Sequence, residues 1–258
     1  MLGSPIAHSL SPALHRAAYA HLGLDWSYTA VQVSERELAA FVSSLDASWR
    51  GLSLTMPLKG VAVEVATQVV EPVGSVGVAN TLVLDGRSRT AYNTDVGGMR
   101  AALAEAGVVD VEWATVLGGG STARAAVAAV AALTDTVVAC VRSPRRASVL
   151  SEVADRVGVT LRVADWREAP AHLRAPLVVS TTPSGSTDGL ARALPDGPGM
   201  LFDVVYDPWP TRLAAGWSSA GGAVLGGLDL LVHQAVGQVE LMTGRSVPVS
   251  VLRAAAQR

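Results

Sequence analysis

Short apolar runs alternate with Ala-rich stretches along the whole chain, and this alternation dominates the hydrophobic pattern. From Trp113 onward the runs WATVL, TVVACV, PLVVS and MLFDVV are apolar at nearly every position, which is typical of strands that are covered on both faces. Strands that alternate with helical stretches predict an α/β fold with largely parallel sheets. We therefore expect a doubly wound sheet in this half of the chain.

The first hundred residues have a less regular pattern. Ser11 and Pro12 predict the N-cap and first turn of a helix that ends near His21. Thr94 or Asp95 is expected to cap a helix that runs to Gly107. The remaining pattern predicts strands at 28–33 and 51–55, a helix at 56–66 entered through Pro57, and two strands joined across Asp85 and Gly86.

Composition narrows the range of partners. Half of the 258 residues are apolar, and the net charge of -2 comes from a mixture of both signs, so there is no basic footprint for nucleic acid or an anionic membrane. No apolar stretch approaches the roughly 18 residues that a bilayer-spanning helix needs. Cys140 is the single cysteine, and the five histidines show no metal-ligand spacing. We expect a cytoplasmic protein with no metal and with neither nucleic acid nor membrane as a partner.

A glycine-rich turn at 117–125, LGGGSTARA, lies between a predicted strand and a predicted helix. Gly118, Gly119 and Gly120 let the backbone approach a pyrophosphate closely, and the N-terminus of the following helix directs free N–H groups toward it. Ser121 and Thr122 add hydroxyl donors. The motif by itself is also compatible with a plain strand-to-helix turn, but its position in an α/β pattern favours a dinucleotide site.

The residues at the end of TVVACV, the strand after the glycine-rich turn and its helix, indicate which nicotinamide cofactor is bound. A protein that binds NAD usually carries an Asp or Glu there for the ribose 2'-hydroxyl, but this chain has the basic sequence VRSPRRA. A guanidinium can pair with a 2'-phosphate, which a carboxylate would repel. Arg142, Ser143 and Arg145 are therefore candidate ligands, and NADP is the predicted cofactor. A solvated basic helix start is the alternative for Arg145 and Arg146.

The chain resembles the shikimate dehydrogenase family in eight motifs that occur in the order of the family and span essentially the whole sequence. They are GSPIAHSLSPALH at 3–15, SLTMPLK at 53–59, GVANTL at 77–82, YNTDVGG at 92–98, GGGSTARA at 118–125, VRSPRRA at 141–147, DVVYDPWPT at 203–211 and GLDLLVHQA at 227–235.

The resemblance implies which residues hold the substrate. It places Ser9 and Ser11 on a carboxylate of the substrate, with Thr55 beside them. Tyr206 and Gln234 would complete the pocket from later segments. Hydroxyl and amide groups suit a polyhydroxylated ring acid, because such a ligand offers one anion and several hydrogen-bonding groups. Ser9 and Ser11 could instead cap a helix; we expect Ser11 to do so in addition, which makes Ser9 the stronger ligand candidate.

The resemblance also implies the reacting groups. Lys59 would be the catalytic lysine, with Asn80 and Asp95 on the ring hydroxyls, and Val204 and Gly227 would contact the nicotinamide end of the cofactor. Hydride transfer from an alcohol needs a group that takes the hydroxyl proton. We treat Lys59 and Asp95 as a coupled pair and leave open which of them accepts it.

Together these features predict two α/β domains. Residues 1–100 would form a substrate-binding catalytic domain to which the C-terminal helices of 228–258 return, and residues 101–227 a Rossmann-type NADP-binding domain. Only Met1 and Leu2 precede the opening motif, which leaves little room for a first strand and suggests a start upstream. Ser53, Ser180, Ser186 and Leu230 depart from the family pattern, but both Lys59 and Asp95 are present.

The expected activity is the NADP-dependent interconversion of shikimate and 3-dehydroshikimate, a step of the shikimate pathway toward chorismate and the aromatic amino acids. The protein would be a monomer or a homodimer. Two alternatives stay open: a related dehydrogenase that acts on quinate or shikimate with NAD, and a non-catalytic NADP-binding regulator on the same fold.

Overall fold

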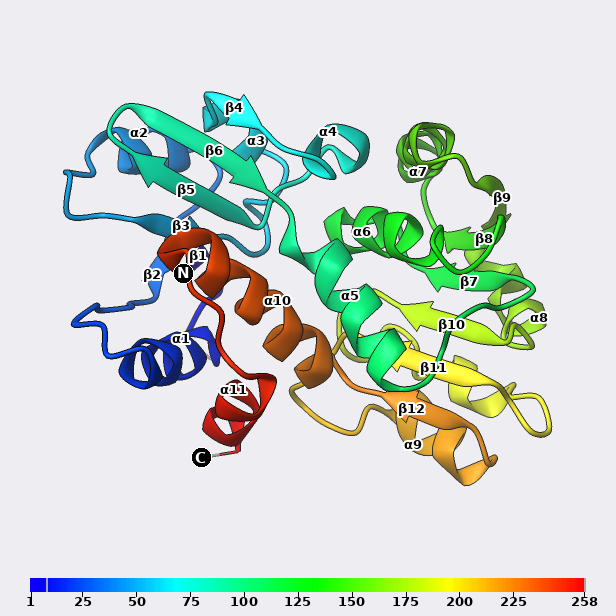
Figure 1. Cartoon of the computed structure of the whole chain (residues 1–258). Helices are drawn as coiled ribbons and strands as arrows, with labels where there is room; N and C mark the ends of the chain where they lie inside the picture. Colours follow the sequence, from blue (N-terminus) through cyan, green and yellow to red (C-terminus); the bar gives the residue numbers. More distant parts are fainter. Residues whose placement is uncertain (8, 258) are drawn as a thin grey trace. The chain divides into compact units, whose positions relative to one another are not determined.

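The computed structural model describes residues 1–7 and 9–257, so His8 of the opening motif lies outside the described residues. The chain divides into two compact units, Met1–Gly98 with Leu231–Arg258, and Met99–Leu230. It passes from one unit to the other inside two helices, α5 (Thr94–Glu105) and α10 (Gly227–Thr243) (Figure 1). Each unit is described by itself below.

The first unit contains a four-stranded sheet in the order β3 (Gly51–Ser53), β5 (Thr81–Asp85), β6 (Ser88–Tyr92) and β4 (Gln68–Val69). β5 and β6 form the expected antiparallel hairpin, and Gly86 in its turn has a φ of 57°, a left-handed conformation that favours glycine. A second ladder pairs β1 (Leu2–Gly3) with β2 (Val31–Gln32) in parallel, and Leu2 also bridges Leu54.

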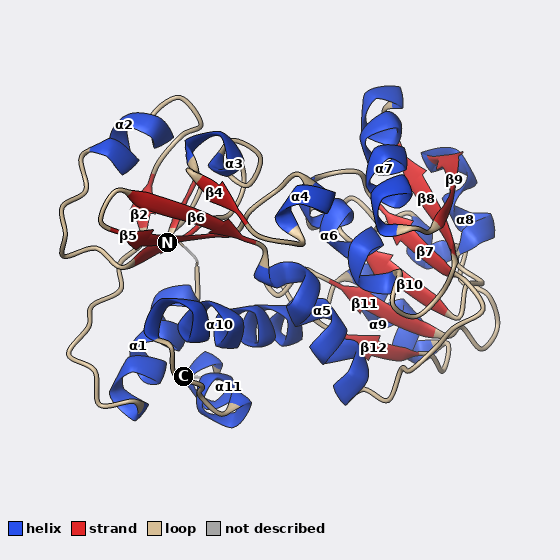
Figure 2. Cartoon of the chain, turned by 45° about the horizontal axis from the view of Figure 1, so that its top comes forward, coloured by secondary structure: helices blue, strands red, loops and turns tan. Residues whose placement is uncertain are grey.

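The helices of the first unit are short apart from α10. They are α1 (Ser11–His21), α2 (Leu38–Ser43), α3 (Ala62–Val65), α4 (Val73–Val76) and α11 (Val249–Ala256), drawn in blue in Figure 2. α11 packs against α1, so the C-terminal segment lies beside the first helix of the chain. The core of the unit is aliphatic, with Leu2, Leu38, Leu54 and Leu58 almost fully buried.

The second unit is a six-stranded sheet in which every pair of neighbouring strands is parallel. Its strand order is β12 (Ala223–Leu225), β11 (Met200–Asp203), β10 (Leu177–Ser180), β7 (Ala114–Leu117), β8 (Thr136–Val141) and β9 (Thr160–Asp165). Its helices are α6 (Ser121–Val130), α7 (Pro144–Val157), α8 (Ala169–His172) and α9 (Arg212–Ser219), with the 3-10 turns η1 (Trp166–Glu168) and η2 (Leu190–Arg192). The order steps outward from β7 in both directions, which is the doubly wound arrangement expected from the sequence.

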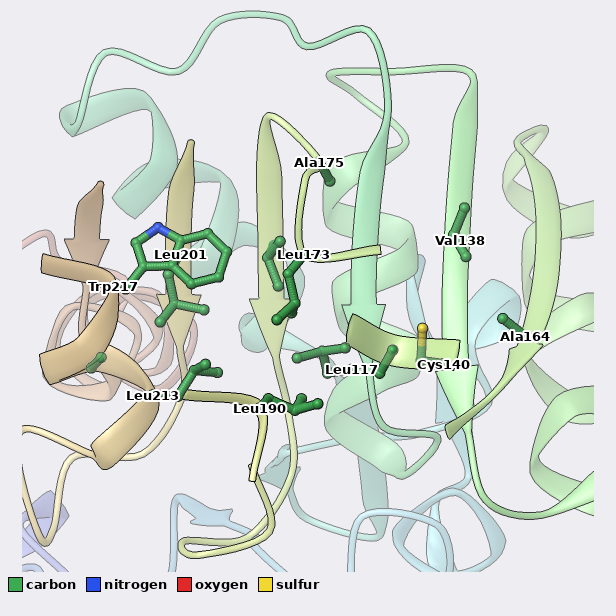
Figure 3. Close-up of a cluster of buried hydrophobic side chains, with 13 residues drawn as sticks. Leu117, Val138, Cys140, Ala164, Leu173, Ala175, Leu190, Leu201, Leu213 and Trp217 are labelled. Atoms are coloured by element: carbon green, nitrogen blue, oxygen red, sulfur yellow. The ribbon is translucent and has the colours of Figure 1, made fainter. Parts of the chain in front are cut away.

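A buried cluster joins the sheet of the second unit to the helices on one of its faces. Figure 3 shows Trp217 and Leu213 of α9 beside Leu201 of β11, with Leu117 and Cys140 from the central strands in the same layer. The Trp217 indole is fully buried, and its N–H donates to the carbonyl of Gly199 at 2.9 Å. Burial raises the pKa of the Cys140 thiol to about 12, which is typical of an inert structural thiol.

Several local expectations from the sequence were wrong. The expected strand at 28–33 is reduced to β2, and the expected helix at 56–66 is reduced to α3, so Lys59 lies in the turn before the helix. The N-cap of α1 is Leu10, and Ser11 is its first helical residue. In the described part of the chain, no helix is long and apolar enough to cross a membrane.

Candidate functional site

Lys59 and Asp95 form an ion pair in the first unit. The Lys59 Nζ lies 2.7 Å from Asp95 Oδ2, and the exposed fractions of the two side chains are 12% and 5%. The pair is held from both sides: the Lys59 carbonyl accepts a hydrogen bond from the Ala79 N–H at 2.8 Å, and Asp95 lies in the first turn of α5. A nearly buried pair of this kind can bind a hydroxyl group and exchange a proton with it.

Asn80 joins the pair through its side-chain amide. Its Nδ2 donates to Asp95 Oδ1 and to Thr94 Oγ1, both at 2.9 Å, while its Oδ1 accepts from the Thr94 backbone N–H at 2.9 Å. Because the Thr94 N–H can only donate, the Asn80 amide can take only the orientation that points its NH2 group at the Asp95 carboxylate. Lys59, Asn80 and Asp95 therefore form one connected group.

Gln234 of α10 completes this group in the first unit. Its Oε1 accepts from Asn80 Nδ2 at 3.2 Å, and its Nε2 donates to the Leu231 carbonyl at 3.0 Å. Gly98 allows α5 and α10 to approach, because a Cβ added there would lie 2.8 Å from the Gln234 nitrogen. Gln234 is 7% exposed, so a ligand that reached it would have to enter the cluster.

The residue that caps α5 was not identified from the sequence. Asn93 Oδ1 accepts from the backbone N–H groups of Asp95 and Val96 at 3.0 and 3.2 Å, while its Nδ2 donates to the Val78 carbonyl. The expectation that Thr94 or Asp95 caps the helix was therefore wrong. Since Asn93 satisfies the free N–H groups, the carboxylate of Asp95 is left to pair with Lys59.

The opening segment lies against the turn that carries Thr55. The Thr55 N–H donates to the Leu2 carbonyl at 2.9 Å, and the Ser4 N–H donates to the Met56 carbonyl at 3.0 Å. Gly3 is required at this approach, because a Cβ there would run into the Thr55 side chain. The structure thus brings the start of the opening motif and Thr55 together.

Ser9 and Ser11 have the opposite of their expected local roles. Ser9 Oγ accepts from the Ser11 backbone N–H at 3.3 Å at the start of α1. Ser11 Oγ is fully buried and has no hydrogen-bond partner among the described residues. A buried hydroxyl without a partner costs free energy unless a ligand satisfies it, so Ser11 is the stronger ligand candidate of the two.

A second polar cluster, around Gln238 and in contact with the Asn80 carbonyl, was not predicted from the sequence. Gln238, one turn after Gln234 on α10, is 1% exposed and contacts Ser53, Thr81 and His15 through hydrogen bonds. Burial lowers the pKa of His15 to about 3, so this imidazole is neutral near pH 7. A Gln four residues after a candidate ligand Gln on the same helix face is a signal that could have indicated this cluster.

The glycine turn of the second unit lies between β7 and α6. β7 has β8 on one side and β10 on the other, so the turn is at the point where the strand order reverses, which is where doubly wound sheets bind ligands. Gly118 has a φ of 113°, and a Cβ on it would lie 2.6 Å from Thr181 Oγ1. A Cβ on Gly120 would meet no atom within 4 Å. Buried Gly119 lies between them, and Ser121 and Thr122 begin α6.

This turn fits a dinucleotide pyrophosphate. The space beyond Gly120 is open, the first turn of α6 presents free N–H groups, and the N-cap residue Gly120 offers no side chain to satisfy them. Gly118, Gly119 and Gly120 would hold the phosphates, with the hydroxyl groups of Ser121 and Thr122 beside them.

The region after β8 fits a 2'-phosphate. Arg142 follows the last residue of β8 directly, and Ser143 is the N-cap of α7. The Arg142 guanidinium lies over the Trp166 ring, 5.1 Å from its centroid, and makes no ion pair with any described residue. A guanidinium that contacts a ring and has no ion-pair partner can still donate N–H groups to a phosphate. Arg145, in the first turn of α7, is exposed.

The remaining predicted residues also belong to the second unit. Val204 follows β11, and Gly227 opens α10 against it: the Gly227 N–H donates to the Val205 carbonyl at 3.1 Å, and a Cβ there would collide with the Val204 carbonyl. Tyr206 is half-buried, and burial, with the neighbouring Asp207 charge, raises the pKa of its hydroxyl. The candidate residues are therefore divided between the two units.

Metal ligands were not expected, and the described residues contain no group of three or more His, Cys, Asp or Glu side chains that could hold a metal ion.

Comparison with known proteins places this geometry in a family. Two family models match: the shikimate dehydrogenase substrate binding domain at residues 1–82, and the shikimate 5'-dehydrogenase C-terminal domain at residues 227–257. A shikimate dehydrogenase (NADP(+)) of Moorella thermoacetica is 36% identical, with 98% of this chain and 90% of the relative covered.

Two solved structures share the whole fold. The crystal structure of Mycobacterium tuberculosis shikimate dehydrogenase is 41% identical with a TM-score of 0.90 and covers 99% of this chain and 96% of its own. Shikimate 5-dehydrogenase of Thermus thermophilus, solved in complex with NADP(H) and shikimate, is 32% identical with a TM-score of 0.87 and covers 100% and 97%. The chain belongs to the shikimate dehydrogenase family.

Proposed function

We propose that this protein oxidises shikimate to 3-dehydroshikimate with NADP+ and catalyses the reverse reduction with NADPH. The observation that carries the proposal is the nearly buried group of Lys59, Asp95 and Asn80, in which an ion pair and an amide converge. Membership of the family supports the reaction, and the bound ligands of the Thermus thermophilus protein support the choice of substrate and cofactor.

The substrate carboxylate is held by the opening segment. Ser11 offers a buried hydroxyl with no partner among the described residues, and Thr55 lies next to the backbone of the same segment. Ser9 supports the turn before α1 and is a second candidate for the same carboxylate. Hydroxyl donors suit a carboxylate, and a ligand without one would leave Ser11 unsatisfied.

The ring hydroxyls are held by Asn80, Asp95 and Gln234 of the first unit, and Tyr206 is a further candidate on the family resemblance alone. Oxidation removes a hydride from the alcohol carbon and a proton from its oxygen. The proton passes to the Lys59–Asp95 pair, whose members are close enough to share it. Bound NADP+ supplies the hydride acceptor.

The cofactor is held by the second unit. The pyrophosphate is held by the glycine turn and the start of α6, that is, by Gly118, Gly119, Gly120, Ser121 and Thr122. The 2'-phosphate is held by Arg142, Ser143 and Arg145. The nicotinamide end of the cofactor lies at Val204 and Gly227. The support for NADP over NAD is the guanidinium of Arg142 at the end of β8, where a carboxylate would be expected for NAD.

A steady-state assay tests the proposal directly. Purified protein is given shikimate or quinate with NADP+ or NAD+, and the reduced cofactor is followed by its absorbance. We expect the highest kcat/KM for shikimate with NADP+. A preference for quinate or for NAD+ would assign the protein to a related dehydrogenase, and NADP+ binding without turnover would make it a regulator.

A further inference from the structure

Gln238 links four segments of the first unit that are far apart in the sequence. It lies on α10, and its side chain contacts α1 through His15, β3 through Ser53, and the start of β5 through Asn80 and Thr81. Ser53 and Thr81 are direct partners in the β3–β5 ladder, so Gln238 lies over a cross-strand pair. None of these contacts is part of the proposed chemistry, although one of the residues contacted is Asn80.

The hydrogen bonds allow only one orientation of the Gln238 amide. Its Nε2 lies 3.2 Å from the Asn80 carbonyl oxygen, which can only accept, so this end must be the donating NH2 group. Its Oε1 then accepts from Ser53 Oγ at 2.9 Å and from His15 Nε2 at 3.1 Å. His15 must carry its proton on Nε2, and Nδ1 is left to accept from the Tyr19 hydroxyl at 3.4 Å.

The donated hydrogen bonds continue from Gln238 to Asp95. Gln238 Nε2 donates to Thr81 Oγ1 at 3.0 Å, which directs the single hydroxyl proton of Thr81 to Asn80 Oδ1 at 2.9 Å. Asn80 Nδ2 in turn donates to Asp95 Oδ1. Gln238, Thr81 and Asn80 therefore each accept a hydrogen bond on one side and donate one on the other, an arrangement in which hydrogen bonds strengthen one another.

We propose that Gln238 is a positioning residue that holds the Asn80 amide in place beside Asp95, through Thr81 and through the Asn80 main-chain carbonyl. The inference rests on the proposed function, because Asn80 and Asp95 are taken to bind the substrate. Gln238 contacts the Asn80 carbonyl directly, beside the Leu54 N–H, and the Asn80 side chain through Thr81, whereas Thr94 contacts the side chain alone. Its loss would allow the amide to move while leaving the ion pair itself in place.

Replacement by residues of similar length tests the donor role. Gln238→Met keeps the unbranched shape but removes all four hydrogen bonds, and Gln238→Glu keeps an acceptor but places a carboxylate against the Asn80 carbonyl. We expect both to raise KM for shikimate and its Kd in titration calorimetry by roughly tenfold or more, with the Kd for NADP+ within about twofold of wild type.

Two further variants separate positioning from stability. Ser53→Ala removes a donor to Oε1 but leaves the bonds to Asn80 and Thr81, so it should lower Tm while KM stays within about threefold. Thr81→Val cuts the link to Asn80 Oδ1 with little change of shape and should raise KM, which keeps the inference testable if the Gln238 variants do not fold. In Gln238→Ala, the added change Ser53→Asn brings an amide beside Thr81 and should restore part of the lost affinity for shikimate.

The outcomes divide clearly. A KM and Kd for shikimate near wild type in folded Gln238→Met or in Thr81→Val would overturn the inference, and an equal rise in Ser53→Ala would reduce Gln238 to a structural residue. If the wild-type protein neither binds nor oxidises shikimate, the proposed function fails and this inference fails with it. If the wild-type protein oxidises shikimate and the variants keep its KM and Kd for shikimate, the inference about Gln238 is rejected and the proposed function stands.

Discussion

At the scale of single residues, the proposed proton transfer depends on the ion pair between Lys59 and Asp95. Lys59 and Asp95 are 36 positions apart in the chain, yet Nζ and Oδ2 lie 2.7 Å apart. We expect Lys59→Ala to lower kcat by roughly 10² to 10⁴ while KM for shikimate stays within a few-fold, because proton transfer is needed mainly in the transition state. Steady-state kinetics under saturating shikimate and NADP+ measure this; a near wild-type kcat would remove Lys59 from the chemistry.

The second member of the pair gives a coupling test. Asp95→Asn keeps the shape of the side chain and removes its charge. If the two groups act as one unit, the Lys59→Ala/Asp95→Asn double variant should be little slower than either single variant. Fully additive losses in kcat would show instead that the two residues act in separate steps.

Ser11 offers a case in which affinity and stability should respond differently. Its buried hydroxyl has no partner in the described structure, so Ser11→Ala should leave the free energy of unfolding unchanged or slightly higher. Loss of a hydrogen bond to a charged carboxylate should raise KM for shikimate about tenfold. For comparison of stability, Ser9→Ala removes the acceptor for the Ser11 N–H and should cost about 1 kcal/mol in urea unfolding. An unchanged KM in Ser11→Ala would leave the segment a structural turn.

Arg142 should determine the choice between cofactors. Its guanidinium lies over Trp166 and makes no ion pair with any described residue, so Arg142→Ala should reduce the difference between the binding free energies of NADP+ and NAD+ by about 1.5 to 3 kcal/mol. Dissociation constants from calorimetry for both cofactors measure the difference. Exposed Arg167, in the neighbouring η1 turn, provides the control Arg167→Ala, for which we expect no change. Equal losses for NADP+ and NAD+ would assign Arg142 a role in folding or in adenine contact.

At the scale of elements, the turn between β7 and α6 contains glycines that are packed against the chain and one glycine that faces open space. Gly120 has an ordinary φ of -87°, and a Cβ there meets nothing within 4 Å, so Gly120→Ala should fold normally. The methyl group would occupy the approach of the pyrophosphate, and we expect NADP+ to bind at least tenfold more weakly. Gly189→Ala, also in open space with an ordinary φ of -65°, should leave the Kd unchanged. Normal NADP+ affinity in Gly120→Ala would place the phosphates elsewhere.

Element boundaries show where local patterns were sufficient. The parallel strands β7, β8, β10 and β11 were predicted from continuous apolar runs, because burial on both faces leaves that pattern. The helix expected at 56–66 is shorter because the Lys59 carbonyl accepts from Ala79, a residue distant in sequence, in place of the helical bond. The two-residue β4 and the edge strand β12 have too few positions to show a period.

At the scale of the whole molecule, His15 should make stability depend on pH. Burial lowers its pKa in the folded protein to about 3, whereas the unfolded chain has the ordinary value near 6.5. The unfolded state therefore binds a proton first, and the stabilising contribution, complete above about pH 6.5, is lost as pH falls toward 3. By pH 5 the loss should be about 2 kcal/mol.

Urea unfolding at several pH values between about 7.5 and 5 checks this expectation. His15→Gln should show a shallower fall in the free energy of unfolding than wild type, whatever its stability at neutral pH. His21 is exposed, so His21→Gln is the control and should keep the wild-type slope. Identical slopes in all three proteins would mean that His15 does not titrate on unfolding.

Periodicity and short motifs predicted the fold class and the glycine turn, since these depend on neighbours within a few positions, whereas Lys59, Asn80 and Asp95 were assigned from the family resemblance. The partners of the polar groups became apparent only from the packed structure. Asn93, not Thr94 or Asp95, caps α5, and Ser9, not Ser11, supports the start of α1. Gln238 meets His15 and Ser53 across 223 and 185 positions. Such hydrogen bonds depend on how β3, α1 and α10 pack, and no local pattern carries that information.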